Sequence, residues 1–335
     1  MVRISFSLLL IMLMALTHDA QGVEGGKPDL RTTVEAAGGL IEFDTNGSPV
    51  SIDLYNGNNP LKGKGGKNDL VTDAWLACLD EVTSLKKLSL ANCAVTDAGM
   101  QRVGRLHGLE ELNLTLTAVT DEGLRQLGGL TQLRVLGLAS SQCTGSGFAP
   151  LGKLTHLESI NFHFTPLNDE GLRAISEVGV QGRLWFAHTK FTDAGAASLA
   201  KLSGLRVCGI GSTHPLSSGD AVAALAGLPL EELSLLDRQA TPAGLAHAAK
   251  IKSLRRLDLG YAPDVDDAAL AAVAQLPHLE EFRIGAAQAV TDAGLLLFTE
   301  TKPLKKLNLS GLKNVSETGI AAFRAARPDV LLESK

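Results

Sequence analysis

Three histidines, His163, His188 and His214, lie along the middle of the chain. Imidazole is the commonest metal ligand among side chains, and three protein ligands with one open position make a catalytic zinc site. No cysteine or carboxylate stands where it would complete this set. The sequence therefore predicts neither a metal site nor a bound cofactor.

Nucleophilic or acid–base catalysis is not indicated either. No Ser–His–Asp or Cys–His arrangement stands out. Residues 55–69 are rich in Gly and Lys but lack the spacing of a phosphate-binding loop, so we expect a surface insertion there. We expect no enzyme, with a glycan- or peptide-processing enzyme as the remote alternative. The most regular acids each follow a Thr or Asn and precede a Gly by two positions, typical of a first helical turn: Asp97, Asp121, Asp169, Asp193 and Asp292.

These acids belong to a recurring unit, clearest at residues 109–130, LEELNLTLTAVTDEGLRQLGGL. The spacing of Leu109, Leu112 and Leu114 does not fit one helix face and ends in alternation, which predicts a short strand. Thr120 is then a helix N-cap, and Val119 and Leu124 form a hydrophobic staple around it. One unit is thus a strand, a corner and a short helix.

The unit repeats along almost the whole chain. Successive copies are 24 or 25 residues apart, and the second apolar position of the strand is always filled by an apolar residue: Leu88, Leu112, Leu136, Ile160, Leu184, Cys208, Leu233, Leu257, Phe282 and Leu307. A fixed period of this length predicts a solenoid, because each unit buries its apolar side only against its neighbours.

The pattern L-x-x-L-x-L followed by V-T-D-x-G-L resembles the leucine-rich repeat superfamily, and its second part is most similar to the ribonuclease-inhibitor-like and cysteine-containing branches. The resemblance covers residues 50–330. It implies a right-handed α/β horseshoe with a parallel sheet on the concave face and short helices on the convex face. It also implies binding of partners, since members share no chemistry. The usual Asn or Cys after the strand is here mostly Thr, Ser or Ala.

Bulk composition agrees with a solenoid and excludes one class of partner. At 335 residues the length would suggest two domains, but a repeat array grows without a second core. The net charge of −5 disfavours a nucleic acid as partner, because phosphate backbones are bound by basic surfaces. The four cysteines occupy different positions of the repeat, so no disulfide is expected.

The two ends of the chain differ from the repeats. In residues 1–20, Arg3 precedes an apolar run that ends at Leu16, which predicts a signal peptide and an exported protein of bacterial type (periplasmic, surface or secreted). An uncleaved segment would be its one membrane anchor. Residues 21–49 predict a helix and the first strand of a β-hairpin that cover the open end of the array. Residues 50–335 form the solenoid, about eleven units with a final strand.

Charged residues early in each strand alternate in sign from unit to unit. Lys86 and Lys87 are followed by Glu110 and Glu111, and the pattern recurs toward the C-terminus. Equivalent residues on neighbouring parallel strands lie about 4.8 Å apart, so opposite charges attract. This ladder predicts fixed register and a solvated face, with a partner-binding charge patch as the alternative.

Trp185 occupies the outward position between the two inner apolar residues of its strand. An exposed aromatic among polar groups is typical of a binding hot spot. The alternative is that Trp185 merely fills space above Gly209. The predicted partner-binding residues are Trp185, Asn161, His163, Arg183, His188, Phe164 and Asn113.

We therefore expect an exported protein–protein interaction module that binds a protein or peptide of unknown identity on its concave sheet. The alternative is an envelope or cell-surface scaffold that acts by self-association. The sequence leaves the oligomeric state open, and also whether the concave or the convex face binds.

Overall fold

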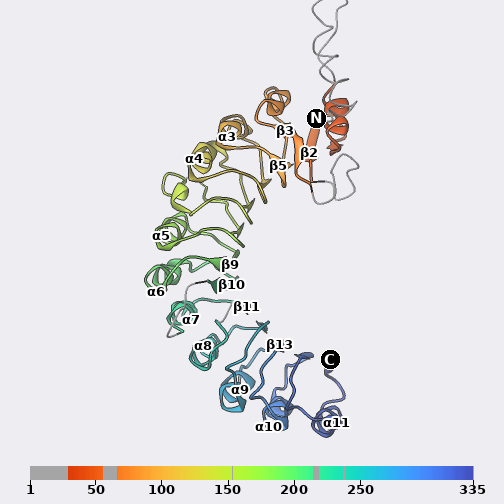
Figure 1. The fold of residues 1–335 in the computed structure, drawn as a ribbon, viewed down its shortest axis with the longest axis vertical. Helices are drawn as coiled ribbons and strands as arrows, with labels where there is room; N and C mark the ends of the chain where they lie inside the picture. Colours follow the sequence, from red (N-terminus) through yellow and green to blue (C-terminus); the bar gives the residue numbers. More distant parts are fainter. Residues whose placement is uncertain (1–28, 56–65, 153, 214–218, 237–238, 335) are drawn as a thin grey trace, which may run out of the picture.

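The computed structural model describes residues 29–55, 66–152, 154–213, 219–236 and 239–334. The chain curves into an arc with the strands on its inner side and the helices on its outer side (Figure 1). Its main sheet has 13 strands in the order β1-β2-β4-β6-β7-β8-β9-β10-β11-β12-β13-β14-β15, and all pairs except β1–β2 are parallel. The predicted α/β repeat solenoid is confirmed.

The strands of the main sheet are β1 Leu40–Phe43, β2 Pro49–Asp53, β4 Lys87–Ser89, β6 Glu111–Asn113, β7 Val135–Gly137, β8 Ser159–Asn161, β9 Arg183–Thr189, β10 Val207–Ser212, β11 Glu232–Leu235, β12 Arg256–Leu259, β13 Glu281–Gly285, β14 Lys306–Ser310 and β15 Leu331–Ser334. A two-stranded sheet adds β3 Asn68–Thr72 and β5 Cys93–Ala94. The α-helices are α2 Leu30–Ala36, α3 Asp97–Val103, α4 Asp121–Arg125, α5 Asp169–Val178, α6 Asp193–Ala196, α7 Asp220–Leu225, α8 Pro242–Ala248, α9 Asp267–Ala274, α10 Asp292–Leu296 and α11 Glu317–Ala326. Short 3-10 helices are η2 Trp75–Leu79, η3 Gln126–Gly129, η4 Ser146–Phe148, η5 Ala197–Lys201 and η6 Leu297–Glu300.

The apolar columns predicted from the sequence lie in register. Leu88 pairs with Leu112 and Leu112 with Leu136, and the same column continues unit by unit to Leu332. Every member of the column is buried, including Cys208. Burial of one strand face against the helices is therefore repeated in each unit, and it fixes which residues face the concave side.

The helix-start motif is explained by contacts between neighbouring units. Thr120 caps its own helix by accepting a hydrogen bond from the Glu122 amide. Its amide and hydroxyl both donate to the Asp97 carboxylate of the preceding unit, at 2.7 Å each. The same paired donation occurs at Thr96, Thr192, Thr291 and Ser316. Acids predicted to lie in the first turn of one helix therefore also hydrogen-bond to the next unit.

The glycine of this motif leaves room for that carboxylate. A Cβ at Gly123 would lie 2.4 Å from Asp97 Oδ1, and one at Gly195 would lie 2.3 Å from Asp169 Oδ1. Such distances are too short for any side chain. At these helix starts, the Asp of one unit and the Gly of the next are therefore required together.

The hydroxyls after the strands hydrogen-bond to nearby backbone. Thr117 and Thr165 donate to carbonyls of their own units, Leu114 and Phe162, at 2.6 and 2.9 Å. Thr189 reaches the next unit, the Gly211 carbonyl, at 2.8 Å.

At the N-terminal end, α2 and the antiparallel β1–β2 hairpin precede the first parallel strand pair, β2–β4. The expected helix and hairpin are thus present. The division of the chain at residues 20 and 49 stays a prediction, and the predicted signal peptide lies outside the described residues. Across the described ranges, no helix is both long and apolar enough to span a membrane.

Candidate functional site

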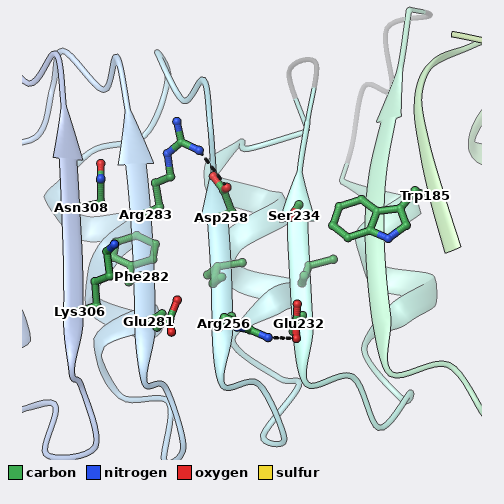
Figure 2. A pocket seen from close by; sticks show the side chains of 12 residues that line it. Trp185, Glu232, Ser234, Arg256, Asp258, Glu281, Phe282, Arg283, Lys306 and Asn308 are labelled. Atoms are coloured by element: carbon green, nitrogen blue, oxygen red, sulfur yellow. Dashed lines mark hydrogen bonds and ion pairs between the residues drawn. The ribbon is translucent and has the colours of Figure 1, made fainter. Parts of the chain in front are cut away.

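Two adjoining hollows lie on the concave face, and Trp185, Ser234 and Asp258 line both of them. We call the first the aromatic hollow, of about 960 Å³, which also includes Phe164, His188 and Tyr261. The second is the charged hollow, of about 450 Å³, shown in Figure 2. Its further polar residues are Glu232, Arg256, Glu281, Arg283, Lys306 and Asn308.

Trp185 points out of the sheet, as its position in the strand predicted. In register it pairs with Asn161 on one side and Gly209 on the other. Its ring covers Gly209 so closely that a Cβ there would lie 2.1 Å from ring carbon Cε3. Trp185 nevertheless remains half-buried rather than enclosed. It therefore fills the space above Gly209 and also offers an open surface to the two hollows.

Phe164 and His188 form an exposed aromatic pair at the edge of the concave face. Their rings stack at 4.4 Å with an interplanar angle of 12°, and Phe164 is 60% exposed. Both residues adopt left-handed backbone, with φ of 58° and 54°. This conformation costs a residue other than Gly about 1–2 kcal/mol. The repeat places the same strain at one corner position in several units: Asn92, Leu116, Ser140 and Ala286.

His163 is held between its neighbours by two backbone contacts. Its Nδ1 accepts the Ala187 amide at 3.0 Å, which assigns the proton of the neutral ring to Nε2. Its own amide donates to Asn161 Oδ1 at 3.0 Å, and its ring centroid lies 6.0 Å from that of Trp185. Asn161 thus positions His163, and His163 flanks Trp185.

The structure brings together only part of the predicted site. Trp185, His163, Phe164 and His188 share the aromatic hollow. Asn113 lies three strands from Trp185 and accepts the Thr115 amide at 3.1 Å, the same turn that Asn161 makes. None of Asn113, Asn161 and Arg183 is among the described residues that line either hollow.

Among the lining residues that were not predicted are Tyr261 and Asp258. Tyr261 is 50% exposed and stands two residues after the third apolar position of its strand, as Phe164 and His188 do in theirs. That shared position is the signal by which the sequence could have identified it. Asp258 follows Trp185 by three strands in the same outward ladder.

Most charges of the concave face are paired across neighbouring strands, which confirms the predicted ladder. Lys86 pairs with Glu110 at 3.0 Å and Lys87 with Glu111 at 2.7 Å. The other rungs are Arg134–Glu158, Arg255–Glu280, Lys305–Glu280, Arg256–Glu232, Arg283–Asp258 and Lys306–Glu333.

Asp258 differs from the other acids of the ladder. Burial raises its pKa, and Arg283, whose Nη1 lies 3.3 Å from Oδ2, offsets that rise only in part together with the Gly260 amide. By contrast, hydrogen bonds from Lys305 and Arg255 lower the pKa of Glu280. Asp258 is therefore a carboxylate whose charge the fold compensates incompletely.

Metal or thiol chemistry finds no support in these contacts. Within the described ranges no three His, Cys, Asp or Glu side chains gather as ligands, and His214 lies outside them. All four cysteines are free. Burial raises the pKa of Cys143 to about 12 and that of Cys78 to about 11, so both stay thiols at neutral pH.

Comparison with known proteins points to the same repeat. The family model described as Leucine Rich repeat matches residues 83–104, 107–128 and 153–176. Among solved structures, the chain is similar to an internalin from Listeria monocytogenes, at 17% identity over 76% of this chain and 82% of the internalin, with a TM-score of 0.47. No curated protein matches the chain. The matched stretches follow the same strand, corner and helix that build the 13-stranded sheet, and the chain is a leucine-rich repeat protein.

Proposed function

We propose that this chain binds a partner protein on its concave sheet, through the aromatic hollow around Trp185. Leucine-rich repeat proteins generally bind proteins, and their folds are typically non-enzymatic, so an interaction module is the function that the architecture supports. The observation that carries the concave site is the cluster of Trp185, Phe164, His188 and Tyr261, open to solvent in a chain of 4% aromatic content.

The exposure of these rings is costly unless something covers them. Phe164 leaves 60% of its surface in water and Tyr261 leaves 50%. Burying such a side chain gains about 1.5–3 kcal/mol, and aromatic residues dominate interface hot spots. Because the rings stand on a sheet whose register is fixed, a partner would meet a preformed surface and would lose little conformational entropy in ordering it.

Export of the protein is part of this proposal. It is supported by the apolar run after Arg3, followed by the polar residues Thr17, His18 and Asp19. A partner would then be met in the periplasm, at the cell surface or outside the cell. Edman sequencing of the protein purified from its natural source tests the export signal, because a cleaved segment removes the first residues.

Substitution of Trp185 tests the binding surface. A display library of protein fragments is selected on the wild-type protein, and dissociation constants are measured for the selected clones. We expect Trp185→Ala to weaken binding at least about 10-fold, the loss typical of a hot spot. Leu116→Ala is the matched control, because Leu116 is exposed (46%) outside both hollows. Clones that bind Trp185→Ala as well as the wild type would refute the concave site.

Self-association is the second candidate function. Leu331, on the last described strand β15, is 58% exposed, which favours contact with another copy at that edge. Light scattering of the purified protein separates the two: a concentration-dependent rise in mass supports the scaffold, and a constant monomer mass excludes it.

A further inference from the structure

A gap in the outward ladder separates Trp185 from Asp258. The strand order β9, β10, β11, β12 places only Gly209 and Ser234 between them. These are the two smallest residue types in the ladder, and the Trp185 ring already covers Gly209. Since adjacent strands are about 4.8 Å apart, the space above Ser234 is bounded by an aromatic ring on one side and a carboxylate on the other. Figure 2 shows the ring turned toward Ser234.

Asp258 has a cation on one side, whereas Glu280 has one on each side. Arg255 and Lys305 lie 2.5 and 2.6 Å from the two oxygens of Glu280. Asp258 receives Arg283 from β13, and its neighbour toward β11 is Ser234. Arg283 reaches Asp258 from the side opposite Ser234 in Figure 2. Glu280 thus shows that a carboxylate on this sheet can pair with two cations. At Asp258, the position for a second cation adjoins the gap.

The aromatic hollow next to this gap is lined by one acidic side chain and by no Lys or Arg among the described residues. Asp258 is the one acid among the described residues that line it, and five others have aromatic rings: His163, Phe164, Trp185, His188 and Tyr261. A cation over the face of a Trp ring gains about 0.5–2 kcal/mol, and the alkyl stem of Lys or Arg packs readily on apolar surface. The charged hollow differs, since it also contains Arg256, Arg283 and Lys306. Within it, Arg256 pairs with Glu232 and Arg283 pairs with Asp258.

We propose that the gap above Ser234 receives a Lys or Arg side chain of the partner protein. The inference rests on the proposed function, and it specifies the chemistry of the partner. The cation lies between the Trp185 ring and the Asp258 carboxylate, and residues beside it in the partner cover Phe164, His188 and Tyr261. A neutral glycan could also stack on the rings and donate hydroxyls to the carboxylate, but it has no positive charge to pair with Asp258.

The test is a double-mutant cycle with defined peptides. Peptides selected from the fragment library on the wild-type protein are resynthesised with norleucine for Lys or citrulline for Arg. We expect the neutral residue at one position to weaken binding to the wild type at least about 10-fold. Asp258→Asn should weaken binding of the parent peptide by a similar factor, and it should bind the parent and the neutral peptide with nearly equal affinity. Asn is tolerated there because burial disfavours the ionised carboxylate.

Two further variants locate the effect. Ser234→Lys places an internal ammonium in the gap and should compete with the basic peptide while keeping the fold, checked by circular dichroism. Glu281→Gln is the control, because Glu281 lines the charged hollow and not the aromatic hollow. It should leave the discrimination between parent and neutral peptide unchanged.

The outcomes separate this inference from the proposed function. If the selected peptides need Trp185 and yet bind equally well with norleucine or citrulline, that result would overturn the proposed requirement for a basic side chain and leave the concave binding site supported. Trp185-dependent binding to neutral oligosaccharides on a glycan array, with no peptide selected, would overturn both. Loss of discrimination in Asp258→Asn together with retention in Glu281→Gln supports the inference.

Discussion

Two regions of each unit, the N-terminus of its helix and the centre of its concave face, differ in the contacts that their side chains make within the fold. At the helix starts, Asp97 accepts hydrogen bonds from Thr120, and Asp121 accepts them from Thr144. A polar group of one unit is thus satisfied by the next unit. On the concave face, Trp185 and Phe164 point away from the core, and their ring contacts are with Gly209, His163 and His188.

This difference separates residues that hold the array from residues available for binding. A residue type that recurs at every unit is explained by its neighbours in the stack. A residue that breaks the recurrence, as Trp185 does among Ser, Asn and Gly, has no such explanation. Substitutions at the two places should therefore affect different measurements, and three of them test the contrast, beginning with the largest change in the free energy of unfolding.

Gly123→Ala should disrupt a helix start. Its Cβ would lie 2.4 Å from Asp97 Oδ1 and 2.8 Å from Val119 Cγ1, so both side chains must shift. Overpacking of this kind costs about 1–3 kcal/mol, measured by urea unfolding. Gly227→Ala is the matched control, because a Cβ at Gly227 meets no atom within 4 Å. Equal stability of the two variants would show that the close approach of Asp97 is not needed.

Asp121→Asn should change how stability depends on acid. Burial alone would raise the pKa of Asp121, but hydrogen bonds from Thr144, Gly145 and Gly147 outweigh it and lower that pKa. The stability they provide is thus present above the unfolded pKa of about 3.9 and is lost as the pH falls through the lower folded pKa.

At pH 6 the Asn variant should be less stable by about 1–2 kcal/mol, and the deficit should shrink toward pH 2. This is below the full value of about 1.5–3 kcal/mol for hydrogen bonds to a charged group, because Asp121 is only half-buried. Urea unfolding at several pH values measures it. Asp264→Asn, at an exposed position, serves as the control. A deficit that stays constant with pH would contradict this account of Asp121.

Phe164→Asn should have the smallest effect on stability. Asn tolerates the left-handed backbone of this corner, as Asn92 does in an earlier unit, so relief of strain offsets the lost stack on His188. We expect the free energy of unfolding to change by less than about 0.5 kcal/mol, the range for surface substitutions, while the selected clones bind more weakly. A large loss of stability would place Phe164 with the residues that hold the array.

The fold was predictable because its causes are local in sequence. Apolar residues at a fixed spacing predict both the strand and its buried face, and Thr120 before Asp121 predicts the start of α4. The partner of each Asp was not predictable, since it belongs to the next unit and the contact exists only after stacking.

The candidate site was predictable only in part. Trp185 could be placed because strand alternation decides which side chains point outward. The left-handed corner at Phe164 and His188 could not, because neither residue type signals it as Gly or Asn would. Asp258 was missed because it is three strands and more than seventy positions along the chain from Trp185, and only the sheet makes them share a hollow.

The alternating charges carry a consequence for how this array could have been lengthened. At the first charged position of each strand the signs run plus, minus, plus, minus from Lys86 to Glu158, and resume with plus at Arg206 after the neutral Gly182. Insertion of a single unit within either block would set like charges side by side, whereas insertion of a pair preserves the alternation. Within the array, an odd number of units can be inserted without placing like charges side by side only next to Gly182. This neutral position lies three residues before Trp185. The neutral position at Gly182 thus divides the charge ladder into two blocks, and Trp185, the centre of the proposed binding surface, lies on the strand at this division.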